Sequence, residues 1–375
     1  MTMPMPKVTV LMPVFNGAAF LRQAIESILC QTYRDFELLI IDDGSTDDSS
    51  FIISSYDDHR IRLFQNSGNL GLVASLNRGL DLARGSYFAR MDCDDFSLPT
   101  RLEKQLRFMY ANTDVGVCGT WYREFGGHDR ITRCPAQHED IWCRSLFNPA
   151  VGHPTVMMRR SVIERVGLRY DETYCHGEDF DLWSRMLSTV KFANLEEVLL
   201  LYRVHPGQIS SSRFMIQRGV AGQVRRRMLQ DLGIYPSEEE FELHQFLSTL
   251  GTTRDSTYCL MPPAVCFDHV DLWLCKLKQA NQRVNLYPEP AFTRTLIERW
   301  GGVVLLEYVA QGKWGQIPFR LPRIVTQASF GASHLARRIG KEVITRLHDL
   351  ILMRQSEKLI QRHIPLGRID EAANS

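Results

Sequence analysis

Three carboxylates lie within four residues, at Asp92, Asp94 and Asp95, directly after the apolar stretch 86–89. Such charges repel one another unless a cation lies between them. Asp92 and Asp94 are two residues apart and can point at one hard cation. Carboxylate oxygens suit Mg or Mn, ions that also bind substrate phosphates. The run therefore predicts a divalent-cation site. The alternative interpretation is a solvated acidic turn.

Glu178 and Asp179 form a second acidic pair, and the apolar spacing of Leu182, Met186 and Leu187 predicts that they lie in the first turn of a helix. A carboxylate held at a helix start can accept a proton as a general base. The alternative is a capping pair that only interacts with the helix dipole.

The elements that must position these groups are read from the apolar pattern. Strand, loop and helix alternate four times, with buried strands predicted over 8–12, 37–41, 61–64 and 86–89. This alternation predicts an α/β fold with a mainly parallel, Rossmann-like sheet flanked by helices. Ligands of such sheets bind at the carboxyl ends of the strands. The residues that follow the strands fall on that rim: Pro13, which is expected to end the first strand, Asn16, a candidate N-cap of the next helix, Asp42, Asp43, Asn69 and the acidic run.

Asp42 and Asp43 precede Gly44-Ser45, which is a common turn signal. The functional alternative is that one carboxylate accepts hydrogen bonds from a base or a ribose. The chain has no glycine-rich dinucleotide loop at this position and no P-loop motif. We therefore expect phosphate to be held mainly by the metal.

Three further residues have both a structural and a functional interpretation. His153, in Gly-His-Pro, indicates either a tight turn or a residue of the ligand-binding site. Arg203 and His205 follow the apolar strand 198–201, and alternation places them on one side. They form either a strand-end pair packed against an acidic neighbour, or a site in which His205 contacts the metal or a phosphate and Arg203 supports it.

The bulk composition is that of an ordinary globular protein. The chain has 375 residues, of which 44% are hydrophobic and 23% charged, and its formal net charge is +1. That charge gives no global attraction to nucleic acid. Nine cysteines without a Cys-x-x-Cys pair disfavour a zinc site and favour reduced thiols in the cytoplasm. We expect no signal peptide and no membrane span.

Taken together, the motifs resemble the family-two inverting glycosyltransferases with the A-type nucleotide-sugar-binding fold. The resemblance covers roughly residues 6 to 212 and rests on an ordered set of motifs. These are Pro13-Val14-Phe15-Asn16, Asp42-Asp43-Gly44-Ser45-Thr46-Asp47, Asn69-x-Gly71, Asp92-Cys93-Asp94-Asp95, Pro99-x-Arg101-Leu102, Gly152-His153-Pro154-Thr155, Glu178-Asp179-Phe180-Asp181-Leu182-Trp183 and Tyr202-Arg203-Val204-His205.

The resemblance implies transfer of a sugar from a nucleoside diphosphate sugar, UDP-linked by family frequency, to an acceptor hydroxyl with inversion and with Mn or Mg. It implies that Asp179 is the base, with Glu178 as the runner-up or a positioning residue. Metal ligands would be Asp92, Asp94 and His205, with Asp94 favoured as the direct ligand. Nucleotide and sugar contacts would come from Pro13, Asn16, Asp42, Asp43, Asn69, Asp92 and Arg203, and the acceptor would lie near His153.

The chain departs from the processive members of that family, which carry Gln-x-x-Arg-Trp after the base. Its Arg299-Trp300 lies far down the chain, with Leu296 at the Gln position. We therefore expect transfer of one sugar in polysaccharide, lipid-linked glycan or cell-envelope synthesis, with a glycan or lipid-linked acceptor.

The last third predicts helices, one of which is expected to begin at a capping box formed by Ser237 and Glu240. We expect a catalytic domain over 6–212, a helical extension over 213–312, and a candidate amphipathic segment and tail over 313–375. The apolar face within 324–364 predicts a packing or homodimer helix, or a basic helix on the inner face of the membrane.

Two rival functions have clear discriminators. A sugar nucleotidyltransferase would need a glycine-rich basic loop after the first strand and would release pyrophosphate. A non-catalytic nucleotide-sugar-binding protein would not need the carboxylates at Asp92, Asp94 and Asp179.

Overall fold

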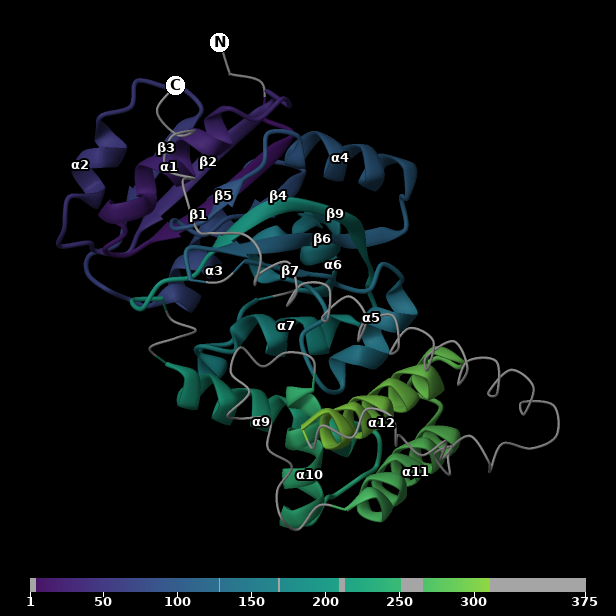
Figure 1. Cartoon of the computed structure of the whole chain (residues 1–375). Helices are drawn as coiled ribbons and strands as arrows, with labels where there is room; N and C mark the ends of the chain where they lie inside the picture. Colours follow the sequence, from purple (N-terminus) through teal and green to yellow (C-terminus); the bar gives the residue numbers. More distant parts are fainter. Residues whose placement is uncertain (1–4, 128, 168, 209–212, 251–265, 311–375) are drawn as a thin grey trace, which may run out of the picture. The chain divides into compact units, whose positions relative to one another are not determined.

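The computed structural model describes the chain except residues 1–4, 128, 168, 209–212, 251–265 and 311–375 (Figure 1). Backbone contacts divide the chain into two compact units, Met1–Pro236 and Ser237–Ser375. The segment 324–364 and the serine-rich stretch 209–212 lie outside the described residues. None of the described helices is both long enough and apolar enough to cross a bilayer.

The first unit is built on a nine-stranded mixed sheet with the order β3-β2-β1-β4-β8-β6-β9-β5, and β7 pairs with β6. The strands are β1 Val8–Val14, β2 Phe36–Asp42, β3 Ile61–Gln65, β4 Tyr87–Arg90, β5 Phe96–Ser97, β6 Val115–Phe125, β7 Arg130–Thr132, β8 Met157–Arg159 and β9 Lys191–Arg203. Strands β1 to β4 are parallel, as the sequence predicts. Beyond β4 the pairing is mixed, because β8 is antiparallel to both β4 and β6 while β6 and β9 are parallel.

Helices cover both faces of this sheet. Those of the first unit are α1 Ala18–Leu29, α2 Ser49–Ser54, α3 Leu72–Leu82, α4 Arg101–Ala111, α5 His138–Ser145, α6 Arg160–Val166, α7 Glu178–Met186 and α9 Phe214–Asp231, with short 3₁₀ turns at His153–Thr155 and Glu172–Tyr174. One core cluster contains side chains of α1, α2 and α4, and the other contains side chains of α3, α5, α6 and α7.

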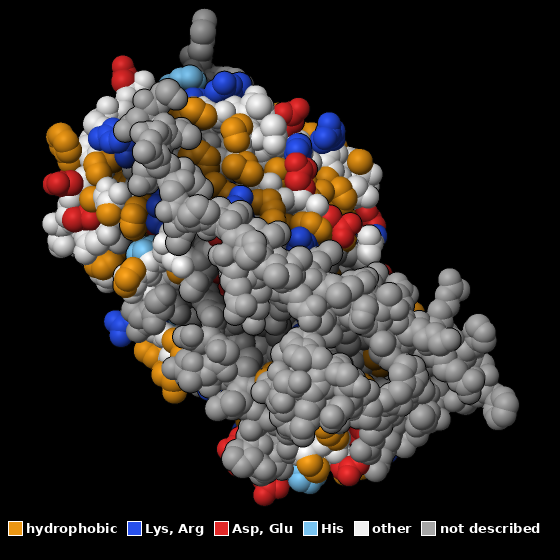
Figure 2. Space-filling view, in the orientation of Figure 1, with side chains coloured by type: hydrophobic (Ala, Val, Ile, Leu, Met, Phe, Trp, Pro, Cys, Tyr) orange, Lys and Arg blue, Asp and Glu red, His pale blue; other side chains and the backbone are white. Residues whose placement is uncertain are grey.

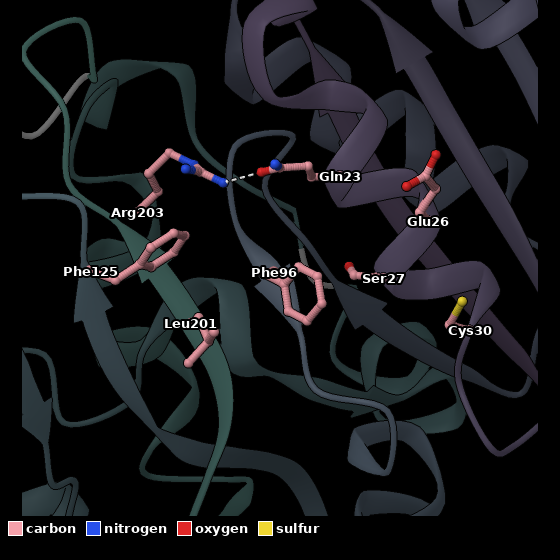
Figure 3. A pocket seen from close by; sticks show the side chains of 8 residues that line it. All are labelled: Gln23, Glu26, Ser27, Cys30, Phe96, Phe125, Leu201 and Arg203. Atoms are coloured by element: carbon pink, nitrogen blue, oxygen red, sulfur yellow. Dashed lines mark hydrogen bonds between the residues drawn. The ribbon is translucent and has the colours of Figure 1, made fainter. Parts of the chain in front are cut away.

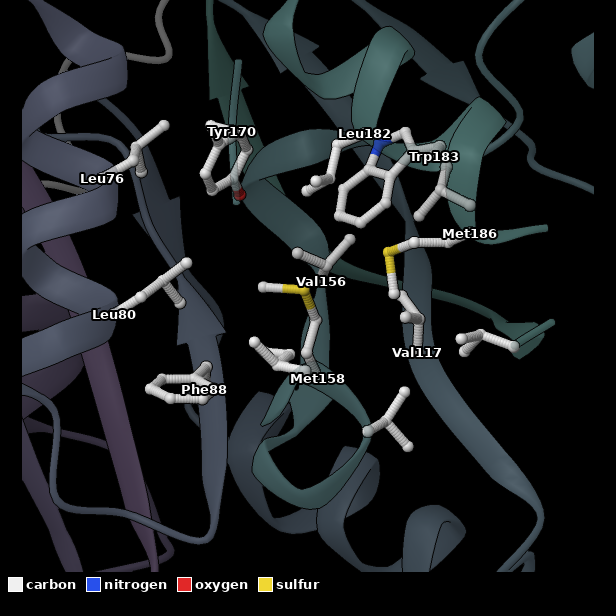
Figure 4. Close-up of a cluster of buried hydrophobic side chains, with 14 of the residues drawn as sticks. Leu76, Leu80, Phe88, Val117, Val156, Met158, Tyr170, Leu182, Trp183 and Met186 are labelled. Carbon is white, nitrogen blue, oxygen red and sulfur yellow. The ribbon is translucent and has the colours of Figure 1, made fainter. Parts of the chain in front are cut away.

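Strand β2 is buried on both faces, which explains why residues 38–41 are continuously apolar. Leu38 and Ile40 enter the core on the α1 face, and Leu39 and Ile41 enter the core on the α3 face. A strand buried on both faces has no polar alternation. Figure 4 shows the α3-face cluster, in which Leu80 lies beside Phe88 of β4 and Leu76 lies on the side of Tyr170. Trp183 and Met186 of α7 cover Val117 and Val156.

Pro13 does not end the first strand, as the sequence predicts it to, because β1 continues through it to Val14. The Leu11 carbonyl accepts from Met91 on the β4 side, and the Val14 carbonyl accepts from Asp43 on the β2 side. Alternation therefore directs the Pro13 nitrogen to the side where β4 has already ended at Arg90. A proline is tolerated there because no ladder hydrogen bond is lost.

The second unit is helical over its described residues, as predicted for the extension. It contains α10 Glu238–Thr249, α11 Phe267–Val284 and α12 Ala291–Ala310. The predicted capping box at the start of α10 is present, with Ser237 Oγ accepting from the Glu240 amide. Helix α9, which the sequence groups with this extension, belongs by its contacts to the first unit.

Candidate active site

The acidic run forms a loop at the carboxyl end of β4. Asp92, Asp94 and Asp95 each present a carboxylate oxygen, and these oxygens lie within 4.8 Å of one another. Burial, followed by the charges of Asp92 and Asp94, raises the pKa of Asp95 well above its usual range, and its buried Oδ2 atom has no hydrogen-bond partner in the described structure. Clustered hard oxygens that repel one another fit a divalent cation such as Mg or Mn.

Arg90, the last residue of β4, is a buried cation whose charge acts on Asp92, Glu178 and Asp179. It is 5% exposed and forms an ion pair with Asp92. Its carbonyl accepts a hydrogen bond from the fully buried Arg101, whose Nη2 lies 2.7 Å away. Burial raises the pKa of Asp92 to about 6, although a quarter of its side chain is exposed, and Arg90 opposes this shift. Arg90 thus favours the ionised form of a carboxylate that burial would otherwise protonate.

Arg203 and His205 reach the acidic loop from the end of β9, and the structure brings both to Asp94. The Nε2 atom of His205 lies 3.0 Å from Oδ2 of Asp94. The Arg203 side chain donates to the Asp94 carbonyl at 2.8 Å, and its amide donates to Asp95 Oδ1 at 2.9 Å. The guanidinium lies between the rings of Phe20 and Phe125, at 4.4 and 4.5 Å. These contacts fix the acidic loop against β9.

Asp42 and Asp43 lie at the carboxyl end of β2, which β1 separates from β4 in the sheet, and both are buried. Asp43 accepts from the Asn66 side chain at 2.6 Å and from the amides of Leu70 and Gly71 at 3.0 and 2.8 Å. Asp43 therefore holds the loop after β3. Asp42 accepts from the Ser45 amide at 3.0 Å. The exposed Asn69 accepts from the Gly71 amide at 3.1 Å.

Asn16 does not cap α1, contrary to the sequence-based expectation. It adopts a left-handed conformation with φ of 51°, and its Oδ1 accepts from the Thr46 amide at 2.8 Å. The first amides of α1 are satisfied instead by Asp47, whose Oδ2 accepts from Ala18 at 3.0 Å. The loops after β1 and β2 are therefore tied together on one side of the rim.

Glu178 and Asp179 occupy the first turn of α7, as predicted. Burial, and then the charge of Asp179, raises the pKa of Glu178 to about 7. Burial also raises the pKa of Asp179, while the Phe180 amide and Arg90 lower it. The Asp179 charge in turn raises the pKa of Asp92. The two acidic clusters are therefore close enough to act on each other, with Arg90 acting on both.

His153 is a buried residue on which the charge of Arg90 acts. It is 7% exposed, and its Nε2 atom is 2.9 Å from the Tyr170 hydroxyl. Burial, and then Arg90, holds the pKa of His153 well below its usual range, so the ring is neutral at pH 7. Its ring also contacts Trp183 edge-on, at 6.0 Å. Its position on the acceptor side stays a prediction.

Helix α9 holds α7 in place. The fully buried Asp181 of α7 accepts from Arg227 at 2.7 Å and pairs with Arg185 at 2.8 Å. Arg227 also donates to the Ser184 hydroxyl at 2.6 Å. Removing a cationic partner of a buried carboxylate strongly destabilises the folded protein, because it leaves a buried charge without compensation. The orientation of the Glu178–Asp179 turn thus depends on α9.

Gly177, immediately before this turn, gives a prediction. Its φ of −151° suits any residue, but a Cβ atom would lie 2.7 Å from Cγ1 of Val220 in α9. Gly177→Ala should displace the turn and lower the rate of sugar transfer by about tenfold to a hundredfold, because small misplacements of reacting groups are costly. Donor affinity should change little. Steady-state kinetics of the Gly177→Ala/Val220→Ala double variant provide the control, since this variant should recover activity. A double variant as slow as the single one would contradict the packing argument.

A cavity of about 400 Å³ lies beside the acidic loop, between α1, β5 and β9 (Figure 3). Phe96, Phe125 and Leu201 supply apolar walls, and Arg203 donates to Gln23 at 2.7 Å. Arg203 lines the cavity and also donates to the Asp94 carbonyl and to Asp95. The cavity therefore borders the candidate site without containing its carboxylates.

Sequence reasoning assigned no role to Arg90, Asp95 or Tyr170, all of which interact with the candidate groups. The sequence did contain a signal for Arg90. An arginine at the end of an apolar strand and next to an acidic run is expected to pair with a carboxylate of that run, because buried charges are paired. Asp95 belonged to the run itself. Tyr170 carried no local signal, since it lies 17 residues from His153 in sequence.

A mixed α/β sheet with an acidic loop at the carboxyl end of a central strand defines the A-type glycosyltransferase fold. Residues 9–167 match the model of Glycosyl transferase family 2. A glycosyltransferase of Haemophilus influenzae is 32% identical over 238 residues, which cover 59% of this chain and 72% of that protein. The chain therefore belongs to glycosyl transferase family 2. This membership selects glycosyl transfer over the nucleotidyltransferase and non-catalytic alternatives.

Two further similarities are informative. The Escherichia coli UDP-Glc:α-D-GlcNAc-diphosphoundecaprenol β-1,3-glucosyltransferase WfgD is 28% identical over 209 residues, covering 55% of this chain and 81% of that protein. The crystal structure of Staphylococcus aureus TarS 1–349 in complex with UDP-GlcNAc matches with a TM-score of 0.54 at 15% identity, covering 82% of this chain and 92% of that one. The second similarity supports the fold.

Proposed function

We propose that this glycosyltransferase moves one sugar from a UDP-sugar to a hydroxyl of a glycan or lipid-linked acceptor, with inversion and with Mn or Mg. The observation that carries the proposal is the cluster of Asp92, Asp94 and Asp95, whose carboxylate oxygens lie within 4.8 Å of one another. The charge of Asp179 acts on Asp92 of this cluster. Together these two observations support a cleft with a cation-binding wall and a proton-accepting wall. The UDP donor and the lipid-linked acceptor are carried over from the name of the WfgD relative.

Asp94 and His205 would hold the cation, with Asp92 beside them. When bound, such an ion stabilises the negative charge of a departing diphosphate. Arg203 keeps the acidic loop in place through the Asp94 carbonyl and Asp95. The rim where the base and ribose would lie is lined by Pro13, Asn16, Asp42, Asp43 and Asn69. Asp43 contributes by shaping the loop after β3.

Asp179 would take the proton of the acceptor hydroxyl. The acceptor oxygen then forms a bond to the anomeric carbon from the face opposite the leaving group. The bond between that carbon and the phosphate oxygen breaks, and its electron pair leaves with the nucleoside diphosphate. Glu178 acts as a positioning neighbour, and His153 supports the acceptor side through Tyr170.

Transfer of a single sugar is also proposed. Arg299, in the chain's Arg-Trp pair, is 7% exposed in the second unit and donates to the Leu250 carbonyl at 3.1 Å. Arg299 of that pair therefore packs α12 against the end of α10, and the Gln-x-x-Arg-Trp pattern of processive enzymes is absent from the sequence.

The proposal is tested by a donor panel of UDP-, GDP- and dTDP-sugars, read by released nucleoside diphosphate with Mn, Mg or EDTA. Acceptors are free sugars and synthetic sugar-diphosphate lipids. We expect one UDP-sugar to react in an acceptor-dependent and EDTA-sensitive manner. Release from GDP- or dTDP-sugars alone would overturn the UDP assignment, and full activity in EDTA would overturn the metal dependence.

The raised pKa of Glu178 predicts the pH dependence. Below about pH 7 Glu178 is protonated, and above it the Glu178–Asp179 pair carries its full negative charge and accepts a proton more readily. The kcat/KM for transfer should therefore rise with pH and level off above about 7. In Glu178→Gln this limb should move to lower pH, because the group that titrates near 7 is gone. If the pH dependence of kcat/KM were the same in Glu178→Gln as in the wild type, a group other than Glu178 would be titrating.

A further inference from the structure

The first turn of α9 exposes an unusual group of apolar side chains. Phe214, Met215 and Ile216 are 43%, 71% and 46% exposed. In the part of the chain that the structure describes, this is the one place where three consecutive large apolar residues are exposed. Large apolar groups grouped on a surface commonly mark an interaction site. Figure 2 shows hydrophobic side chains at the edge of the molecule where α9 begins in Figure 1.

This end of α9 is more exposed than the rest of the helix. The buried residues of α9 begin at Gly222, and Phe214, Met215 and Ile216 belong to neither of the two core clusters of the first unit. Exposed Arg213 and Arg218 flank the apolar residues, and the first turn contains no acidic residue. Bulky apolar side chains between exposed arginines suit the boundary between anionic headgroups and acyl chains.

The apolar turn lies close to the candidate base. Val220 is the residue that a Cβ atom at Gly177 would meet, so α9 touches the chain immediately before Glu178. Ile216 precedes Val220 by four residues, which corresponds to about 6 Å along a helix axis. The Arg213 charge also acts on His176, one residue further upstream. A surface held by this turn would lie next to the proton-accepting wall of the site.

We propose that residues 213–218 form a docking surface for an anionic lipid bilayer. The two arginines approach the headgroups, and Phe214, Met215 and Ile216 enter the boundary region. The purpose of this docking rests on the proposed function, because a lipid-linked acceptor would then present its hydroxyl beside Asp179. The docking itself does not depend on the donor or the chemistry.

Vesicle co-sedimentation of the full chain tests the proposal. The wild type should bind vesicles of phosphatidylcholine with phosphatidylglycerol, and bind vesicles of phosphatidylcholine alone more weakly. Met215→Ser/Ile216→Ser should weaken partitioning at least about tenfold, since the burial of two large apolar side chains is lost. Arg213→Gln/Arg218→Gln should weaken it by about tenfold at low salt and by less at high salt. Phe51→Ser, at a residue that is 74% exposed on α2, is the matched control and should bind as the wild type does.

Three outcomes would overturn the docking surface. These are a wild type that does not bind anionic vesicles, a Met215→Ser/Ile216→Ser variant that binds as tightly as the wild type, or a variant whose oligomeric state changes in light scattering while vesicle binding does not. Nucleoside diphosphate release with a water-soluble acceptor is measured in parallel. Vesicle binding without any such release would contradict the proposed function and leave the docking surface standing, so the two failures are distinguishable.

Discussion

The Asp179→Asn protein should transfer sugar about a thousandfold more slowly than the wild type while binding nucleotide with nearly the same affinity. Asparagine keeps the shape of the side chain but cannot accept a proton from the acceptor hydroxyl, and general-base catalysis typically contributes about a hundredfold to ten-thousandfold. The Phe180 amide, which donates to Asp179 at 2.7 Å, can still donate to the asparagine oxygen. The loss should therefore appear in kcat, as measured by released nucleoside diphosphate.

Asp171→Asn is the matched control for this substitution. Asp171 is exposed, and it accepts from the Thr173 amide at 2.9 Å in a turn close to α7. Its replacement changes the same charge without removing the candidate base, so activity should stay near the wild-type level. If Asp179→Asn kept substantial activity while Glu178→Gln lost it, the base would be Glu178.

Asp94→Asn should produce a different defect. The variant loses the negative charge that would face the cation. It also loses the contact between the His205 ring and the Asp94 carboxylate. We expect the gain in nucleotide affinity caused by Mn to fall at least about tenfold, and the transfer rate to fall at least about a hundredfold. Titration calorimetry with nucleoside diphosphate, in Mn and in EDTA, measures the first effect.

The control for Asp94→Asn is Asp48→Asn, at an exposed residue before α2. In EDTA, Asp94→Asn and the wild type should bind nucleotide equally, because the lost interaction is with the cation. A variant that keeps its full response to Mn would remove Asp94 from the ligand set. Asp92 and Asp95 would then be the remaining carboxylates of the cluster.

The rim of polar residues could be predicted because it follows from local patterns. Each apolar run such as 37–41 is short and is followed by polar residues, and parallel strands bring those residues to one edge. The second half of the sheet could not be predicted in this way. Strand β8 has three residues and is antiparallel to both β4 and β6, a pairing set by contacts far apart in sequence.

Side-chain roles were harder to predict than strand positions. A carboxylate such as Asp43 looks the same in sequence whether it binds a ligand or holds a loop, and here it accepts three hydrogen bonds from residues 66–71. Arg90 was missed because, besides Asp92 and Asp95 of the acidic run, the groups on which its charge acts include residues of α7 and of the loop before it. Asn16 was misread as a cap because the first amides of α1 are satisfied by a loop 29 residues away.

The most direct test of the account is a crystal structure with Mn and the nucleoside diphosphate that the donor panel identifies, analysed by anomalous scattering at the manganese edge. The account predicts one anomalous peak bound by Asp94, next to the diphosphate, with the Asp179 carboxylate facing the same cleft. A diphosphate bound without an anomalous peak at the acidic loop, or a peak remote from Asp94, would contradict it.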